Sequence, residues 1–92
     1  MRPKLTDDQI REELATLKGW SRAGDVLVKV FTFPKFADGI AFVGRVAKAA
    51  DAADHHPDID IRYTKIKMCL STHDAGGVTA ADISLARQID NS

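Results

Sequence analysis

Hydrophobic and polar positions repeat with two different periods along this chain, and the two periods predict different elements. Apolar residues three and four positions apart predict a first helix from Thr6 to about Lys18. Residues 36–54 carry two such stripes and predict a long central helix. A last helix is predicted from Thr79 to about Ile89, because a capping signature precedes its apolar positions.

Alternating apolar and polar residues, which are typical of strands, fill the segments between the predicted helices. A short run at 20–22 and a β-branched and aromatic run at 26–33 predict a hairpin. Two further runs at 59–63 and 66–72 predict a second antiparallel pair, joined by a turn at 64–65. That turn has no Gly or Asn, so its type and the strand boundary stay open.

The element order α-β-β-α-β-β-α with short connections predicts an α+β fold. In this fold a four-stranded antiparallel sheet carries three helices packed on one face. A length of 92 residues fits a single domain over residues 1–92. The strand at 26–33 is apolar on both faces, and in so small a chain a second apolar surface indicates an interface between subunits.

Charge and composition narrow the class of protein. Thirteen basic and thirteen acidic residues balance, unlike the basic surfaces that bind nucleic acids or anionic membranes. The longest apolar stretches fall far short of the roughly 20 residues of a membrane-spanning helix. Residues 1–10 lack the apolar segment of a signal peptide, and the single Cys69 cannot form an internal disulfide. We therefore expect a cytoplasmic protein with no direct nucleic-acid or membrane partner.

All three histidines lie at the ends of predicted elements, and imidazole is the side chain that titrates closest to neutral pH. His55 and His56 follow the central helix, and His73 follows the last predicted strand. If these two ends meet, the three rings share one rim, which would be the functional site. Several carboxylates lie near them in the sequence and could orient the rings: Asp51, Asp54, Asp58, Asp60 and Asp74.

Purely structural roles also fit several polar and aromatic residues of the chain. Adjacent histidines before Pro57 suit a solvated helix end. Asp82 is accounted for by a helix cap, and Trp20 by a place in the core. We expect no metal site, because no two histidines stand four positions apart and Cys69 is not part of a CxxC pair.

A spaced pattern extends over 32 residues of the chain. It consists of Asp51, His55-His56-Pro57, Tyr63, His73 and Asp82, with Asp54 before the histidine pair, Leu70-Ser71-Thr72-His73-Asp74 around the third histidine, and Gly19-Trp20 after the first helix. This pattern resembles the pterin-4a-carbinolamine dehydratases. The fold of that family has the same α-β-β-α-β-β-α order over nearly the whole chain.

The resemblance implies an activity and a set of residues that perform it. The activity is removal of water from a 4a-hydroxytetrahydropterin to give a quinonoid dihydropterin, which is then reduced and reused by an aromatic amino acid hydroxylase. Pterin is then the substrate, and no separate cofactor is implied. The implied catalytic residues are His55, His56 and His73, and the implied substrate-binding or supporting residues are Asp51, Asp54, Pro57, Ser71, Thr72, Asp74, Trp20 and Asp82.

The resemblance also implies partners, and it leaves more than one function open. Members of the family form homodimers or homotetramers, and some mammalian members act as dimerisation cofactors of a homeodomain transcription factor. Mammalian members carry a cysteine two residues after the third histidine, where this chain has Ala75, so any role of that thiol is absent. A non-catalytic oligomeric interaction module on the same fold is the alternative function, and a zinc-binding domain is a third.

Overall fold

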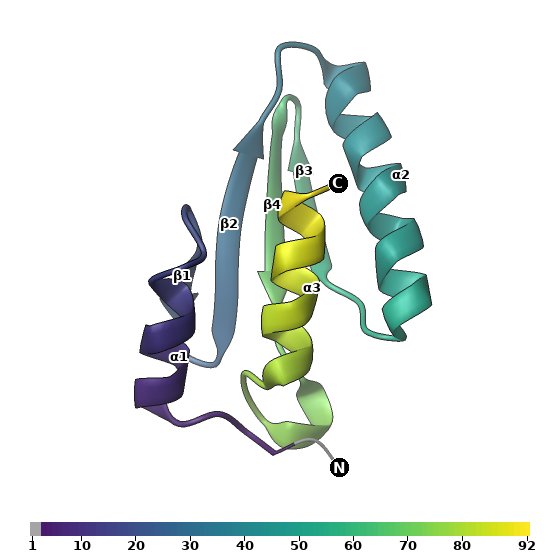
Figure 1. Cartoon of the computed structure of the whole chain (residues 1–92). Coiled ribbons are helices and arrows are strands. Elements are labelled where there is room, and N and C mark those ends of the chain that lie inside the picture. Colours follow the sequence, from purple (N-terminus) through teal and green to yellow (C-terminus); the bar gives the residue numbers. More distant parts are fainter. Residues whose placement is uncertain (1–2) are drawn as a thin grey trace.

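The computed structural model describes residues 3–92, and three helices cover one face of a four-stranded antiparallel sheet (Figure 1). The strands lie in the order β1-β2-β4-β3, so each hairpin contributes one edge strand and one central strand. This arrangement confirms the predicted α+β class and element order. The elements are α1 (Asp7–Leu14), β1 (Ser21–Ala23), β2 (Val26–Thr32), α2 (Phe36–Ala53), β3 (Asp58–Arg62), β4 (Lys65–Leu70), the single 3₁₀ turn η1 (His73–Ala75) and α3 (Ala80–Asp90).

The core lies between the sheet and the helices and is centred on β4. Alternate residues of this strand, Ile66, Met68 and Leu70, are completely buried, whereas Lys65 and Lys67 are exposed and Cys69 is half-buried. Gly39 lets α2 approach β4 closely, because an added Cβ would lie 3.3 Å from the Ile66 side chain. Gly44 has no such neighbour within 4 Å, so close packing does not explain it.

The first helix is shorter than predicted: it ends at Leu14 and not near Lys18. The carbonyl oxygen of Glu13 accepts two hydrogen bonds from Thr16, one from its backbone N–H at 3.1 Å and one from its hydroxyl at 2.9 Å. These bonds span three residues, so they tighten the chain and replace the four-residue ladder of an α-helix. Leu17 is still buried, because the tighter turns keep it on the core side.

The turn between β3 and β4 lies at Tyr63-Thr64, one residue earlier than predicted. Pairing Ile61 with Ile66 aligns the apolar residues of the two strands, and this register places Arg62 opposite Lys65. Tyr63 therefore takes a left-handed conformation with φ 53°, although it is not a glycine. Its ring is exposed and stacks on Phe36 with 6.4 Å between the ring centroids.

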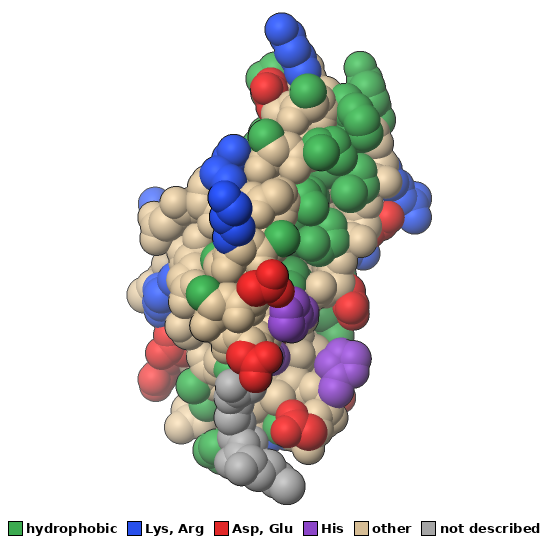
Figure 2. Space-filling view, turned by 90° about the vertical axis from the view of Figure 1, so that its right-hand side faces the viewer, with side chains coloured by type: hydrophobic (Ala, Val, Ile, Leu, Met, Phe, Trp, Pro, Cys, Tyr) green, Lys and Arg blue, Asp and Glu red, His purple; other side chains and the backbone are tan. Residues whose placement is uncertain are grey.

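An apolar surface remains outside the core. The exposed large hydrophobic residues are Val30, Phe36, Ile40, Ile61 and Tyr63. Figure 2 shows hydrophobic side chains gathered along one side of the molecule, with histidine and acidic side chains below them. Over residues 3–92, no helix combines the length and the apolar character needed to cross a bilayer.

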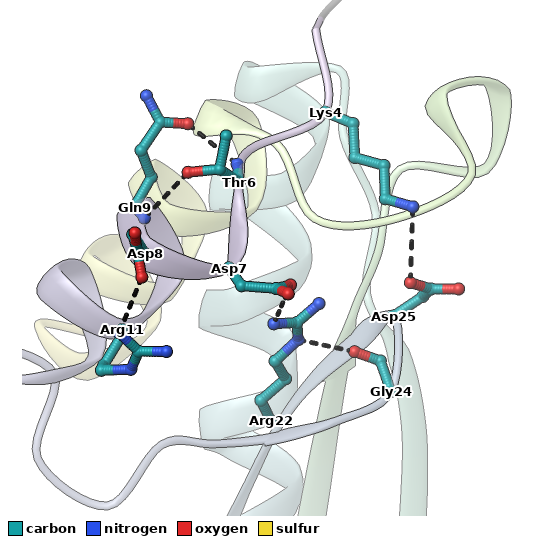
Figure 3. Close-up of polar contacts among 9 residues, drawn as sticks. All are labelled: Lys4, Thr6, Asp7, Asp8, Gln9, Arg11, Arg22, Gly24 and Asp25. Atoms are coloured by element: carbon teal, nitrogen blue, oxygen red, sulfur yellow. Dashed lines mark hydrogen bonds and ion pairs between the residues drawn. The ribbon is translucent and has the colours of Figure 1, made fainter.

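Exposed polar contacts connect α1 to the first hairpin (Figure 3). Arg22 donates to the Asp7 carboxylate at 2.8 Å and, through Nε, to the carbonyl oxygen of Gly24 at 2.7 Å. Lys4 lies 3.8 Å from the Asp25 carboxylate on the same hairpin. The hydrogen bond from Arg22 and its positive charge hold the pKa of Asp7 below the ordinary value of 3.8.

We predict that Asp7→Asn lowers stability at neutral pH and that its effect disappears in acid. A carboxyl group whose pKa is lowered by folding stabilises the folded state above its unfolded pKa and loses this effect as pH falls through the folded value. The difference between the variant and the wild type should therefore shrink below pH 3.8. Urea unfolding at neutral pH and below pH 3.8 measures this difference in the free energy of unfolding, and Glu12→Gln serves as the control. A difference that does not change with pH would contradict the charge-based explanation.

Candidate active site

The three histidines meet at one end of the molecule, where α2 and β4 both finish (Figure 1). They line a cavity of about 330 Å³, which we call the histidine cavity. The predicted convergence of the three rings is therefore present. The residues that line the cavity are Asp54, His55, His56, Ser71, Thr72, His73 and Asp74.

The end of α2 sends its two histidines in different directions. Asp54 caps the helix in a left-handed conformation (φ 49°, ψ 42°), which Asp tolerates better than most residues. The backbone N–H of His55 then bonds to the carbonyl oxygen of Ala50 at 3.1 Å, which keeps His55 against the helix end. As a result His55 is buried, whereas the side chain of His56 is 59% exposed.

The other wall of the cavity follows β4. Thr72 pairs with Gly77 across a short loop, and its backbone N–H donates to the Gly77 carbonyl oxygen at 2.9 Å. Gly76 allows this return because it adopts a left-handed conformation with φ 72°. The loop therefore presents His73 and Asp74 as exposed side chains on the rim of the cavity.

A buried carboxylate stands behind the cavity. Asp82 is completely inaccessible, and its Oδ1 lies 2.5 Å from Nε2 of His55. Its Oδ2 accepts bonds from the Thr72 hydroxyl at 2.8 Å and from the backbone N–H of Thr79 at 2.9 Å. The predicted helix cap is confirmed, and the same carboxylate also holds His55.

A second pair of histidine and carboxylate lies at the surface. Nε2 of His56 is 2.9 Å from Oδ1 of Asp51, and both side chains are exposed. Asp51 lies in the last turn of α2 and does not line the cavity itself. Its contact with the site is therefore through His56.

Trp20 does not line the cavity, contrary to the expectation from the resemblance. Its indole N–H donates to Asp90 at 3.0 Å, whereas Asp82 lies near the opposite end of α3. Eight residues of helix separate the two carboxylates by about 12 Å. Trp20 is buried among core residues, which is the structural role that also fitted it in the sequence. Pro57 is also outside the lining, although it directly follows the histidine pair.

The structure adds a residue that the sequence analysis did not assign to the site. The hydroxyl of Thr79 lies 2.8 Å from the hydroxyl of Thr72, and Thr79 is completely buried. The capping signature identified Thr79 only as the first residue of a helix. Within residues 3–92, no three His, Cys, Asp or Glu side chains are grouped closely enough to hold a metal ion.

Comparison with known proteins identifies the family. The family model for pterin 4 alpha carbinolamine dehydratase matches residues 3–92. The chain belongs to this family. A relative from Roseiflexus sp., named provisionally as a pterin-4-alpha-carbinolamine dehydratase, is 52% identical over 90 residues, which cover 98% of this chain and 97% of the relative. A similarly named dehydratase relative from Sulfurisphaera tokodaii is 48% identical over 95% of this chain and 94% of its own.

Solved structures of pterin dehydratase relatives match the fold. A protein from Brucella melitensis, described as a transcriptional coactivator/pterin dehydratase, superposes with a TM-score of 0.92 at 31% identity and covers 96% of both chains. A pterin dehydratase-like protein described as a RuBisCO assembly factor has a TM-score of 0.64 at 23% identity, over 78% of this chain and 83% of its own. The second match shows the fold alone, so the chemistry has to be argued from the site.

We predict that the two histidine–carboxylate pairs differ sharply in their contribution to stability. Asp82→Ala leaves His55 and Thr72 without their buried partner, and breaking a buried pair in this way costs about 3–5 kcal/mol. Asp51→Ala removes an exposed pair, for which about 0–1 kcal/mol is expected. Urea unfolding of both variants gives the two losses in free energy of unfolding. If Asp82→Ala does not fold, Asp82→Asn takes its place in the comparison. Equal losses would show that the buried carboxylate is not a structural centre.

Proposed function

We propose that this protein removes water from 4a-hydroxytetrahydropterins and releases quinonoid dihydropterins. The observation that carries the proposal is the convergence of three imidazoles on one cavity of about 330 Å³. Ligand sites for small molecules start at about 300 Å³, so a bicyclic pterin is of suitable size. Membership in the pterin 4 alpha carbinolamine dehydratase family supports the same activity.

The reaction requires one acid and one base. The C4a–O bond breaks, and the departing hydroxide must be protonated because it is a poor leaving group. A base receives the proton of the adjacent ring nitrogen. The electron pair of that nitrogen then forms the new double bond to C4a. Imidazole serves in either role near neutral pH. No covalent intermediate with the protein is needed.

We assign His55 and His73 as the acid and the base, exchanging roles with the direction of the reaction, and His56 as the residue that orients the substrate. Support for His55 comes from its fixed position against Asp82. Support for the other two comes from their exposed places on the rim. The remaining polar residues of the lining that would bind the amide and amino groups of the pterin are Asp54, Ser71 and Asp74. Thr72 is buried and its hydroxyl donates to Asp82, so it supports the site from behind.

The product places this protein in the recycling of a tetrahydropterin cofactor. A quinonoid dihydropterin is an oxidised form, so a separate reductase must follow before an aromatic amino acid hydroxylase can reuse it. The alternative is a non-catalytic interaction module, and the Brucella melitensis relative is described both as a coactivator and as a dehydratase. The histidine cavity favours the enzyme, because a module that only binds another protein does not require three converging imidazoles.

We predict that the wild-type protein accelerates dehydration of freshly prepared 4a-hydroxytetrahydropterin in a stopped-flow assay. His55→Ala and His73→Ala should each lower kcat by about a hundredfold to ten-thousandfold, the usual contribution of a general acid or base. The double variant should lose most activity. His56→Ala should act mainly on KM.

Removing His55 leaves Asp82 without its buried partner and should lower the free energy of unfolding. The activity of the double variant is therefore measured at a temperature where its circular dichroism still matches that of the wild type, which separates loss of chemistry from loss of fold. A double variant with normal activity would refute the assignment of these histidines. A wild-type protein that forms a stable oligomer but does not accelerate dehydration would favour the interaction module. Zinc that copurifies and is needed for folding would favour a metal-binding domain.

We further propose that a second copy of the chain covers the apolar side of α2. Phe36 and Ile40 lie one turn apart on this helix and expose 48% and 40% of their area, and Phe36 stacks on the exposed ring of Tyr63. These residues form a contiguous apolar patch, which is typical of an interface. Ile40→Glu should therefore shift the protein toward monomer in light scattering at micromolar concentration. Ala41→Glu adds the same charge on a different side of α2 and should leave the assembly unchanged. A monomeric wild type would contradict this proposal.

A further inference from the structure

The two helices α1 and α3 begin with the same type of capping box but use it in different surroundings. In α1 the box consists of Thr6 and Gln9, and both residues are exposed. In α3 it consists of Thr79 and Asp82, and both are completely buried. A neutral Gln suffices to cap a helix, so the buried charge in α3 points to a second task.

The α3 box continues into a chain of hydrogen bonds. The backbone N–H of Ala81 donates to the Thr79 hydroxyl oxygen at 3.2 Å. The two hydroxyl groups of Thr79 and Thr72 are 2.8 Å apart, and Thr72 donates to Asp82 at 2.8 Å. Thr72 has one proton, which goes to the carboxylate, so Thr79 must be the donor between the two hydroxyls. The direction of every bond in the chain is thereby determined.

The same reasoning assigns the protons of His55. An ionised carboxylate can only accept, so with Asp82 ionised Nε2 of His55 carries the hydrogen that lies between it and Oδ1. Nδ1 has no hydrogen-bond partner within residues 3–92, yet no buried polar atom of these residues is left without a partner. Nδ1 is therefore accessible to solvent, and His55 lines the histidine cavity.

We propose that Thr79, acting through Thr72, is a positioning residue that orients the Asp82 carboxylate. This carboxylate fixes His55 in the tautomer with hydrogen on Nε2, so that Nδ1 exchanges protons with the substrate. This inference rests on the proposed dehydratase function. Nε2 keeps its proton throughout the reaction. Nδ1 accepts a proton when the ring is neutral and donates one when the ring is charged. A buried carboxylate that orients a catalytic imidazole in this way is known from serine proteases.

Asp82→Asn tests the tautomer directly. The amide oxygen of Asn would accept the bonds from Thr72 and from the Thr79 N–H, which turns its NH₂ group toward His55. Nε2 would then have to be an acceptor, and the hydrogen would move to Nδ1. Two-bond ¹H–¹⁵N NMR spectra of the labelled protein distinguish the two tautomers of the neutral ring. We expect Nε2–H in the wild type and Nδ1–H in Asp82→Asn, together with loss of dehydration.

Thr79→Val tests the start of the chain. Valine has the shape of threonine but cannot donate to Thr72, whereas the backbone N–H of residue 79 still reaches Asp82. The Thr72 hydroxyl is then no longer held toward Asp82, so we expect a weaker bond from Nε2–H to Asp82, seen as a changed chemical shift of the Nε2 proton, and a kcat lowered about three- to tenfold, the effect of losing one hydrogen bond. Thr79→Ser keeps a hydroxyl group and should retain both the wild-type chemical shift of this proton and the wild-type kcat. Thr6→Val removes the matching cap of α1 and should change neither.

The outcomes separate this inference from the proposed function. Hydrogen on Nδ1 in the wild type would overturn the inference even if the protein is a dehydratase. Equal chemical shifts of the Nε2 proton and equal kcat in Thr79→Val and Thr79→Ser would also overturn it. A wild type that does not dehydrate the pterin would overturn the proposed function, and the NMR spectra would still decide which nitrogen Asp82 and Thr79 control.

Discussion

The structure depends on one buried contact, the bond between the Asp82 carboxylate and the His55 ring. A carboxylate without water must have partners for its oxygens, or its burial is strongly unfavourable. Asp82 obtains them from the end of α2, the end of β4 and the start of α3. These three segments must therefore meet at one point, and the histidine cavity forms where they do. Stability and the proposed chemistry share the same atoms.

The parts of the fold that local interactions determine could be predicted from the sequence. The two capping boxes connect residues three positions apart, so their signatures marked the starts of α1 and α3 correctly. The end of α1 could not be predicted in this way, because apolar spacing continues to Leu17 while the Thr16 hydroxyl competes for a backbone carbonyl. The turn at Tyr63 follows from the pairing of β3 with β4, which is a property of the sheet.

The site could be predicted only in part. Histidines and acidic residues stood out by their type and spacing, but the contact between His55 and Asp82 joins residues 27 positions apart. Structural roles fitted Trp20 and Asp82 equally well in the sequence, and only packing separates them: one anchors the core beside Asp90, and the other reaches the histidine cavity. Asp82 is a charged residue at the third position of a helix whose start is buried. This feature is the signal that could have assigned its capping partner Thr79 to the site.

The described chain begins and ends in different parts of the molecule (Figure 1). Pro3 shares a shallow depression with His55, so residue 3 lies beside the histidine cavity, whereas the end of α3 lies beside the middle of the sheet, where Asp90 pairs with Lys29 of β2. An affinity tag or a surface linker attached after Ser92 would leave the mouth of the cavity open to a diffusing pterin. The same tag ahead of Pro3 would start next to His55 and compete with the substrate for access.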